Sequence, residues 1–322
     1  MCDEEVYMRK KITNDAVLDV IAVVSNPAQF SKRYFLFEEF CKRMADNPRI
    51  RLTTIELQQR ARPFATSAKI QIRTKEEVWY KENLINVAVK HLSKDWEYVA
   101  WIDADILFMN ASWAEDTIDQ LQTYSVVQMW THAIDLGPCG EILQVNTGFM
   151  YQYVCKQPFD HKYGNYWHPG YAWACRRSAY NVMGGLIDFA ILGSGDHHMA
   201  LCLIGEPCKG IKEGVHPNYI KRVEVFRERC ERDIKRNVGY VRGSIAHFFH
   251  GDKKNRKYWD RWDILIENNF DPMSDISFDE QGLLRLNPEK IGLRDAIRAY
   301  FRSRNEDSCD LRQDYRYTKS KE

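Results

Sequence analysis

The chain contains 322 residues, 44% of them hydrophobic and 28% charged, with a formal net charge of +1. This composition excludes wholesale disorder, and the near-zero charge excludes an overall bias toward nucleic acid. No apolar run reaches the roughly 18 residues that a membrane-spanning helix requires, so we expect no membrane span.

The first half of the sequence alternates between strand-like and helix-like segments. Residues 17–25 (VLDVIAVVS) are rich in β-branched side chains and stop at Asn26-Pro27, which predicts a buried strand followed by a turn. Ser31 is predicted to cap the next helix, whose apolar positions recur at helical spacing as far as Met44. The further elements predicted in this half are a strand over 50–57, a helix over 78–92 and a strand over 98–102. This order predicts an α/β fold with a mainly parallel central sheet flanked by helices.

The second half of the sequence is less regular. Short segments rich in glycine and aromatic residues cover 145–153, 171–175, 192–196 and 244–250. Residues 270–282 are predicted to form a loop, and 292–304 a helix. Beyond residue 262 we expect a C-terminal extension packed on the main domain, with a disordered last dozen residues.

Two aspartates, Asp103 and Asp105, interrupt the apolar run VAWIDADILFMN. Strand alternation places residues i and i+2 on one face, and ligands of parallel sheets bind beyond the carboxyl ends of the strands. We therefore expect both carboxylates to point toward one place. Such a pair repels unless a cation lies between its members, and Mg²⁺ or Mn²⁺ commonly bridges carboxylates to substrate phosphates. A turn with two solvated aspartates is the alternative.

A second candidate segment is His247-Phe-Phe-His250-Gly251, which follows an apolar run. Mixed Asp and His ligation would suit Mn²⁺. Both histidines could bind one ion only if the strand ends between them, and Gly251 is compatible with such a break. The cations that follow, among them Lys253 and Lys257, suit a diphosphate. A histidine packed in the core is the alternative.

A third candidate is Asp196, which follows Gly193-Ser-Gly at an apparent helix start. An exposed carboxylate on such a turn could act as a general base. It could equally cap the helix.

Two broader features remain open. An aromatic cluster could stack on a sugar or a nucleobase or simply pack in the core: Tyr166, Trp167, His168, Tyr171 and Trp173. Residues 221–262 hold thirteen Lys and Arg against six Asp and Glu, which indicates either an anion-binding surface or a solvated helix face.

Several of these segments resemble the GT-A nucleotide-sugar glycosyltransferases, and they are most similar to the β-1,4-galactosyltransferase and N-acetylgalactosaminyltransferase group. Residues 81–88 (KENLINVA) and 95–105 (DWEYVAWIDAD) resemble that group's helix and D-x-D strand. Residues 193–196 (GSGD) stand where the group has the turn W-G-x-G-E-D, although the tryptophan and the second acid are absent here. Residues 250–255 (HGDKKN) resemble its late metal-histidine segment. The similarity covers about residues 17–262.

The resemblance implies an inverting glycosyltransferase. Asp105 and Asp103 would bind Mn²⁺ (or Mg²⁺) holding the diphosphate of a UDP-sugar, with His250 as the late metal ligand and His247 as a further one. Asp196 would be the catalytic base that deprotonates an acceptor hydroxyl. The donor contacts would be Ser25, Asn26 and Arg33 near the uracil and ribose, together with Asn86, Asp103, Lys253 and Lys257.

The same resemblance implies a domain division. A catalytic domain would span residues 1–262, with a nucleotide-sugar half over about 17–110 and an acceptor half over about 140–262. The extension would span 263–322.

The acceptor and the function class stay open at this stage. A glycan or a hydroxymethylated DNA base could accept the sugar; the basic segment favours DNA and the small net charge opposes it. A metal-dependent phosphohydrolase using the Asp and His residues is a second class, and a non-catalytic nucleotide- or carbohydrate-binding module is a third. Nine scattered cysteines without a CxxC pair, and no apolar signal segment, favour a cytoplasmic protein. Beside the animal Golgi members of the group that it resembles, with their membrane anchor and luminal disulfides, this implies an enzyme of bacterial, phage or viral origin.

Overall fold

The computed structural model describes residues 16–157 and 167–311. Within them, a seven-stranded sheet has the strand order β11-β6-β10-β4-β1-β2-β3. Its neighbours pair in parallel except at β10, which is antiparallel to both β4 and β6. The strands are β1 (Leu18–Ser25), β2 (Ile50–Gln59), β3 (Ile70–Thr74), β4 (Tyr98–Ile102), β6 (Val126–Gln128), β10 (Ala172–Arg176) and β11 (Val238–Tyr240).

A second sheet continues from the end of β4. Within the described ranges it has five strands in the order β5-β12-β7-β8-β9. They are β5 (Ile106–Phe108), β7 (His132–Leu136), β8 (Ile142–Gly148), β9 (Trp167–His168) and β12 (Ser244–His247); a separate hairpin joins β13 (Ile276–Phe278) to β14 (Leu284–Leu286). Because β5 follows β4 after only three residues, 103–105 connect the two sheets.

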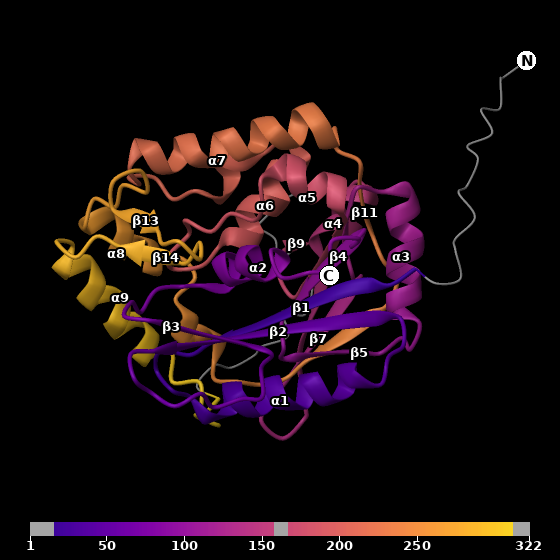
Figure 1. The fold of residues 1–322 in the computed structure, drawn as a ribbon, viewed down its shortest axis with the longest axis horizontal. Helices are drawn as coiled ribbons and strands as arrows, with labels where there is room; N and C mark the ends of the chain where they lie inside the picture. The colour runs from indigo at the N-terminus through magenta and orange to yellow at the C-terminus, as the bar shows by residue number, and fades with distance from the viewer. Residues whose placement is uncertain (1–15, 158–166, 312–322) are drawn as a thin grey trace, which may run out of the picture.

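Helices cover both faces of the large sheet, with α1 on one side and α2, α5, α6 and α7 on the other (Figure 1). The alternation of β1 explains this, because Leu18, Val20, Ala22 and Val24 pack in one hydrophobic cluster and Ile21 packs in the other. The helices are α1 (Ser31–Ala45), α2 (Lys81–Val89), α3 (Trp113–Thr123), α4 (Phe149–Val154), α5 (Arg177–Met183), α6 (Gly195–Ile204), α7 (Pro217–Arg229), α8 (Arg261–Glu267) and α9 (Ile291–Ser303).

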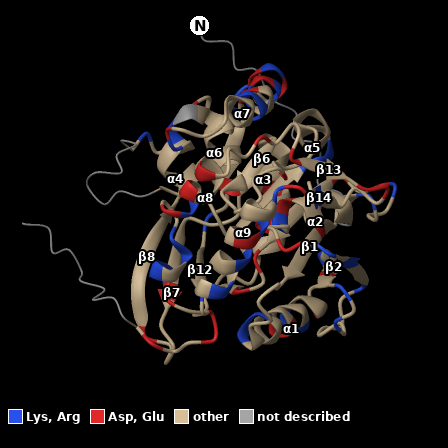
Figure 2. Ribbon diagram, turned by 90° about the vertical axis from the view of Figure 1, so that its left-hand side faces the viewer, with Lys and Arg blue, Asp and Glu red and all other residues tan. Residues whose placement is uncertain are grey.

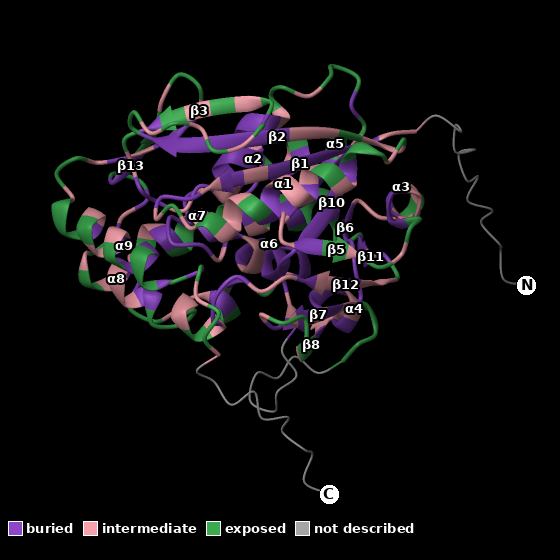
Figure 3. Ribbon diagram, turned by 90° about the horizontal axis from the view of Figure 1, so that it is seen from below, coloured by how far each residue is buried: buried purple, intermediate pink, exposed green. Residues whose placement is uncertain are grey.

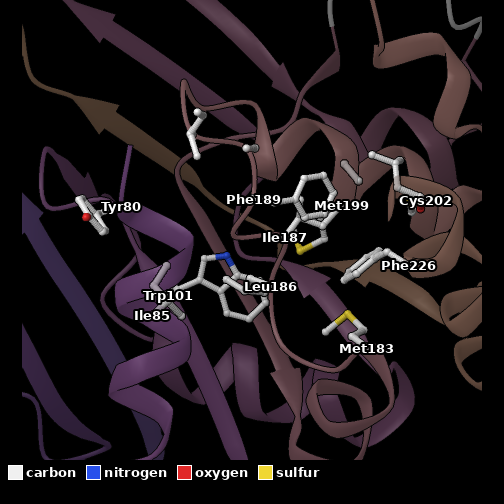
Figure 4. Close-up of a cluster of buried hydrophobic side chains, with 14 of the residues drawn as sticks. Tyr80, Ile85, Trp101, Met183, Leu186, Ile187, Phe189, Met199, Cys202 and Phe226 are labelled. Carbon is white, nitrogen blue, oxygen red and sulfur yellow. Dashed lines mark hydrogen bonds between the residues drawn. The ribbon is translucent and has the colours of Figure 1, made fainter. Parts of the chain in front are cut away.

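The larger cluster joins the sheet to the helices above it. Figure 4 shows Trp101 of β4 and Ile85 of α2 close to Leu186 and Ile187, with Met199 of α6 nearby. Burial falls toward the edge of the sheet: β1 and the second half of β2 are buried, while β3 alternates between half-buried and exposed residues (Figure 3). The carboxyl end of β4 therefore lies deep within the protein.

The C-terminal extension is fixed on the rest of the molecule by polar and apolar contacts. The hydroxyl of Tyr80 donates to the carbonyl of Leu284 over 2.8 Å, and the amide of Asn83 donates to the carbonyl of Gly282 over 2.9 Å. In α9, Ile297 and Phe301 are buried in the larger cluster. The extension is thus packed on the core, as the sequence predicts.

The fold confirms the predicted strands, the mainly parallel sheet and the late helix, and corrects three details. Ser31 is the first residue of α1 and not its cap, which is Phe30 without a side-chain hydrogen bond. The helix predicted over 78–92 runs only from Lys81 to Val89, and the predicted loop 270–282 contains β13. The first fifteen residues, Tyr166 and the last eleven residues lie outside the described ranges. No described helix is long and apolar enough to cross a bilayer.

Candidate functional site

The two aspartates of the D-x-D motif lie in a turn. β4 ends at Ile102 and β5 begins at Ile106, so residues 103–105 are not part of a regular strand. Strand alternation therefore does not position this pair, although both aspartates line one cavity. Asp103 forms an ion pair with Lys81, whereas Asp105 faces two histidines.

Asp105, His247 and His250 form what we call the metal cluster. Nε2 of His250 lies 2.8 Å, and Nε2 of His247 3.9 Å, from Oδ2 of Asp105. One ligand atom from each residue lies within 4.8 Å of the others. The other carboxylate oxygen of Asp105, Oδ1, is buried and has no hydrogen-bond partner among the described residues. The three side chains thus offer a compact set of donors for one cation.

Backbone geometry explains how two histidines three residues apart reach the same point. β12 ends at His247, so strand alternation does not extend to His250. Gly251 follows with φ of +84°, a conformation that favours glycine. The break that the sequence requires between the histidines is present.

Each histidine of the metal cluster has a carboxylate beside its other ring nitrogen. Nδ1 of His247 is 2.8 Å from Oδ1 of Asp135, and Nδ1 of His250 is 3.5 Å from Oε2 of Glu306. A carboxylate at Nδ1 fixes the ring and leaves Nε2 for a metal ion. Asp135 itself also accepts a hydrogen bond from the hydroxyl of Tyr171 over 2.9 Å.

The electrostatics of the metal cluster favour an ionised carboxylate. Burial opposes ionisation of Asp105, but His250, His247 and Arg33 outweigh it and hold its pKa below the ordinary value. One carboxylate and two imidazoles form a donor set that suits Mn²⁺ or a similar divalent ion, so the residues fit the metal that the sequence predicts. The guanidinium of Arg256, whose Nη2 is 2.6 Å from Nε2 of His250, would compete with an ion for that nitrogen.

Asp103, Lys81, Glu82 and Asp196 form a second group, the lysine cluster. Lys81 is the first residue of α2. Burial disfavours its charge, yet Asp103, Asp196 and Glu82 raise the pKa of Lys81. Burial also raises the pKa of Asp103 and raises that of Glu82 to about 7. The pKa of Asp196 is lowered, because Lys81 and nearby histidines outweigh its burial. The ammonium group of Lys81 therefore interacts electrostatically with three carboxyl groups.

A strained turn presents Asp196 to this cluster. Gly193 and Ser194 have φ of +94° and +80°, and α6 begins at Gly195, so Asp196 lies in the first turn and is not the cap. Nη2 of Arg261 donates to Oγ of Ser194 over 2.6 Å and so braces the turn. A Cβ at Gly170 would lie 3.1 Å from Oδ2 of Asp196, so this carboxylate packs against the backbone before β10.

Two members of the aromatic cluster connect the lysine and metal clusters. The ring of His168, near Asp196, stacks on Tyr171 with centroids 4.3 Å apart and planes at 7°. The ring of Tyr171 lies 4.8 Å from that of His247. Trp167 and Trp173 are buried in the hydrophobic core. Core packing therefore describes Trp167 and Trp173, and the stacking on a sugar or a nucleobase stays a prediction.

An open cavity runs beside the D-x-D turn along the β1–α1 loop. Its lining includes Ser25, Asn26, Arg33, Asp103, Asp105 and His250. Oγ of Ser25 is buried and has no partner within the described ranges. The amide of Asn26 is already used, since it donates to the carbonyl of Phe30 over 2.7 Å and accepts from its N–H over 3.0 Å.

Three predicted donor contacts lie outside this cavity lining. The amide of Asn86 donates to the carbonyl of Leu186 over 3.0 Å and accepts from the hydroxyl of Tyr180 over 2.7 Å, so it holds the segment after α5. Lys253 forms an ion pair with Asp135, and Lys257 is exposed. The spacing of these residues in the sequence gave no indication of these partners.

The basic segment 221–262 does not present a single sign of charge along α7. There, Arg227 pairs with Glu224 over 2.6 Å and with Glu231, and blue and red residues lie side by side in Figure 2. The solvated helix face is the better description of this part of the segment.

Several residues that shape the site were not predicted to do so. They are Lys81, Glu82, Asp135, Arg304 and Glu306. Arg256, in contrast, is one of the cations after the histidine segment that the sequence places beside the metal site. Glu306 lies in a polar stretch with no motif, and only the fold brings it to the histidines.

Comparison with known proteins gives matches in structure only. No family model matches the chain, and no curated protein matches it by sequence. A Drosophila β-1,4-galactosyltransferase 7 with manganese, UDP-Gal and xylobiose is 16% identical, with 75% of this chain and 74% of that chain covered and a TM-score of 0.33. In the xylobiose complex of its catalytic domain, this chain covers 65% of the other chain at a TM-score of 0.31. Glucosyl-3-phosphoglycerate synthase from Mycobacterium tuberculosis, with Mn²⁺ and UDP-glucose, is 11% identical, with 85% and 87% covered and a TM-score of 0.38. Both the sequence identities and the TM-scores of these matches are low.

Proposed function

We propose that this protein is a GT-A glycosyltransferase, which transfers a sugar from a UDP-sugar to an acceptor hydroxyl with inversion at the anomeric carbon. The observation that carries the proposal is the position of Asp105 at the carboxyl end of a central strand, with two histidine Nε2 atoms directed at it. Ligands of open α/β sheets bind at such strand ends. A cation there, beside a cavity, suits a nucleoside diphosphate.

Asp105, His247 and His250 would hold the metal ion, Mn²⁺ or Mg²⁺. When bound, the ion supplies positive charge that stabilises a departing diphosphate. Arg33, Arg256 and Arg304 line the same cavity and would add to that charge. Ser25 and Asn26, at the end of β1, would lie near the uracil and ribose.

Asp196 would act as the general base. Its lowered pKa keeps the carboxylate ionised near neutral pH, as a base requires. The carboxylate takes the proton of the acceptor hydroxyl while the acceptor oxygen bonds to the anomeric carbon. The bond from that carbon to the diphosphate oxygen breaks on the opposite face, and UDP leaves. Lys81 balances the charge of Asp103 beside the reacting groups.

We propose a glycan hydroxyl as the acceptor. Acidic residues interrupt the basic ones along α7, where Arg227 pairs with Glu224, so this helix offers the backbone of DNA no run of one sign of charge. Transfer to a hydroxymethylated DNA duplex would instead fall steeply with salt. If such a duplex accepted the sugar and the rate fell steeply with salt, the acceptor would be DNA and not a glycan.

A mass-spectrometric screen of nucleotide sugars with Mn²⁺ tests the function directly. We expect turnover of one or more UDP-sugars in the wild-type protein and none in Asp105→Ala, with UDP binding that requires Mn²⁺. Release of phosphate without sugar transfer would identify a phosphohydrolase. Metal-dependent UDP binding without any turnover would identify a binding module.

A further inference from the structure

The metal cluster receives one of its two outer carboxylates from the C-terminal extension. Asp135, which contacts His247, belongs to β7 of the second sheet, whereas Glu306, which contacts His250, follows α9. At both histidines a carboxylate lies beside Nδ1 and Asp105 beside Nε2, at 2.8 and 3.9 Å for His247 and at 3.5 and 2.8 Å for His250. We call residues 304–308 the C-terminal clasp.

The C-terminal clasp is docked against the start of α1 and against Gly251. Both carboxylate oxygens of Asp307 accept hydrogen bonds at the start of α1, from the N–H of Ser31 over 2.9 Å and from that of Lys32 over 2.8 Å. A Cβ at Gly251 would lie only 2.8 Å from Cα of Glu306, so the chain after His250 needs glycine to admit the clasp. The clasp therefore fits the turn that ends the histidine segment.

Charge holds the carboxylate of Glu306 in place. Nε of Arg304 lies 2.6 Å from its Oε1, and Arg33 forms an ion pair with its Oε2. The side chain is 2% exposed. Two guanidinium groups therefore surround this buried carboxylate and fix its position beside His250.

We propose that Glu306 is a positioning residue for the metal centre: it holds the His250 ring with Nδ1 toward its carboxylate and Nε2 toward Asp105. The C-terminal clasp is then a part of the metal site and not a separate tail. This inference rests on the proposed function, since it assumes that Asp105 and the histidines bind a metal ion.

Metal affinity without nucleotide is the first test. Titration of Mn²⁺, followed by the loss of the free-ion electron paramagnetic resonance signal, should give about 10- to 100-fold weaker binding in Glu306→Ala, the usual effect of removing such a partner. Glu306→Gln keeps an acceptor oxygen and should lose less. Glu77→Ala is the matched control, because Glu77 is likewise a buried carboxylate between two guanidinium groups, those of Arg298 and Arg302, and it contacts neither histidine; it should stay within about threefold of wild type. Asp135→Asn should weaken binding as Glu306→Gln does.

The state of the imidazole separates positioning from a purely structural role. In long-range proton–nitrogen spectra of the Zn²⁺-loaded protein, His250 should carry its proton on Nδ1 in the wild type. That proton should exchange fast with water or disappear in Glu306→Ala. Thermal unfolding of each variant identifies those that have lost stability. A variant that is less stable but otherwise unchanged would keep the wild-type His250 signal.

The outcomes distinguish this inference from the proposed function. If Asp105→Ala binds Mn²⁺ like the wild type, the metal cluster is wrong and both proposals fall. If Asp105→Ala loses Mn²⁺ while Glu306→Ala keeps both its affinity and its His250 signal, only the role of Glu306 falls. Tighter UDP binding by Glu306→Ala with unchanged Mn²⁺ affinity would also overturn that role, since it would identify the carboxylate as a competitor of the diphosphate.

Discussion

The metal cluster and the lysine cluster start from the same turn and solve the same electrostatic problem in different ways. Asp103 is neutralised by a cation of the chain itself, Lys81, and burial raises its pKa. Asp105 faces two imidazoles and keeps one buried oxygen without a partner in the described part of the chain, and its pKa is lowered. Two residues of separation thus divide a D-x-D motif into an internal ion pair and a site open to an external cation.

The largest expected effect concerns the lysine cluster. Asp196→Asn should lower kcat by about 10²- to 10⁴-fold, the usual contribution of a general base. Mn²⁺ affinity should stay close to that of the wild type, because Asp196 is not in the metal cluster. Steady-state kinetics with the donor found in the screen, combined with Mn²⁺ titration, measures both. A kcat within tenfold of wild type would remove Asp196 from the reaction.

The two aspartates should differ in metal binding. Asp105→Asn should weaken Mn²⁺ by more than about 100-fold, beyond the effect of losing an outer partner, whereas Asp103→Asn should stay within about tenfold. The physical reason is that, of the two aspartates, Asp105 is the one whose carboxylate lies beside the two histidine Nε2 atoms. Calorimetric titration of both variants provides the measurement. An equal loss of Mn²⁺ affinity in the two variants would show that both carboxylates bind one ion. Asp103 would then belong to the metal cluster.

Lys81 should matter for stability more than any exposed lysine. Lys81→Met leaves buried carboxylates without their cation and should cost about 4 kcal/mol in the free energy of unfolding. Lys42, which pairs with Glu39 on the exposed side of α1, is the matched control; Lys42→Met should leave the free energy of unfolding close to that of the wild type. Urea unfolding gives both values. If the two substitutions cost the same, the lysine cluster is not an electrostatic unit.

The smallest expected effect is the pH dependence that Glu82 adds. Its pKa is about 7 in the folded protein against an ordinary 4.5, so the folded state binds more protons between these values. The free energy of unfolding should therefore fall as pH rises through this window. Glu82→Gln should remove that fall and be about 3 kcal/mol more stable than wild type at pH 8, given the two pKa values and about 1.4 kcal/mol per pKa unit.

Thermal unfolding across pH checks this prediction. The difference between Glu82→Gln and wild type should vanish near pH 4, where Glu82 is protonated in both states. A difference that persists at pH 4 would point to packing against Trp79, whose indole N–H donates to Glu82 over 2.8 Å.

Most of the fold was predictable because local patterns decide it. The apolar run of β1 and the helical spacing of α1 are properties of neighbouring residues, and both elements were predicted within a residue. The antiparallel insertion of β10 between β4 and β6 was not predictable, since it depends on pairing across distant segments.

Some residues of the candidate site were likewise predictable from the local sequence, and others were not. Asp105 and the two histidines carry local signals, and the structure brings them together. The ion pair of Asp103 with Lys81 depends on where α2 starts in space, which no spacing encodes. Glu306 is harder still, because its role depends on a polar segment that folds back over the molecule.

The position of β10 has a consequence for the order in which the chain folds. The carbonyl of Tyr171, directly before β10, accepts the N–H of Asp103 over 2.8 Å, and β10 fills the place between β4 and β6. During synthesis, the D-x-D turn therefore lacks this hydrogen bond and its neighbouring strand until β10 has left the ribosome. Such distant pairing is slow to form. The segment that carries both aspartates is among the early parts of the chain to be made and among the later ones to reach its final shape.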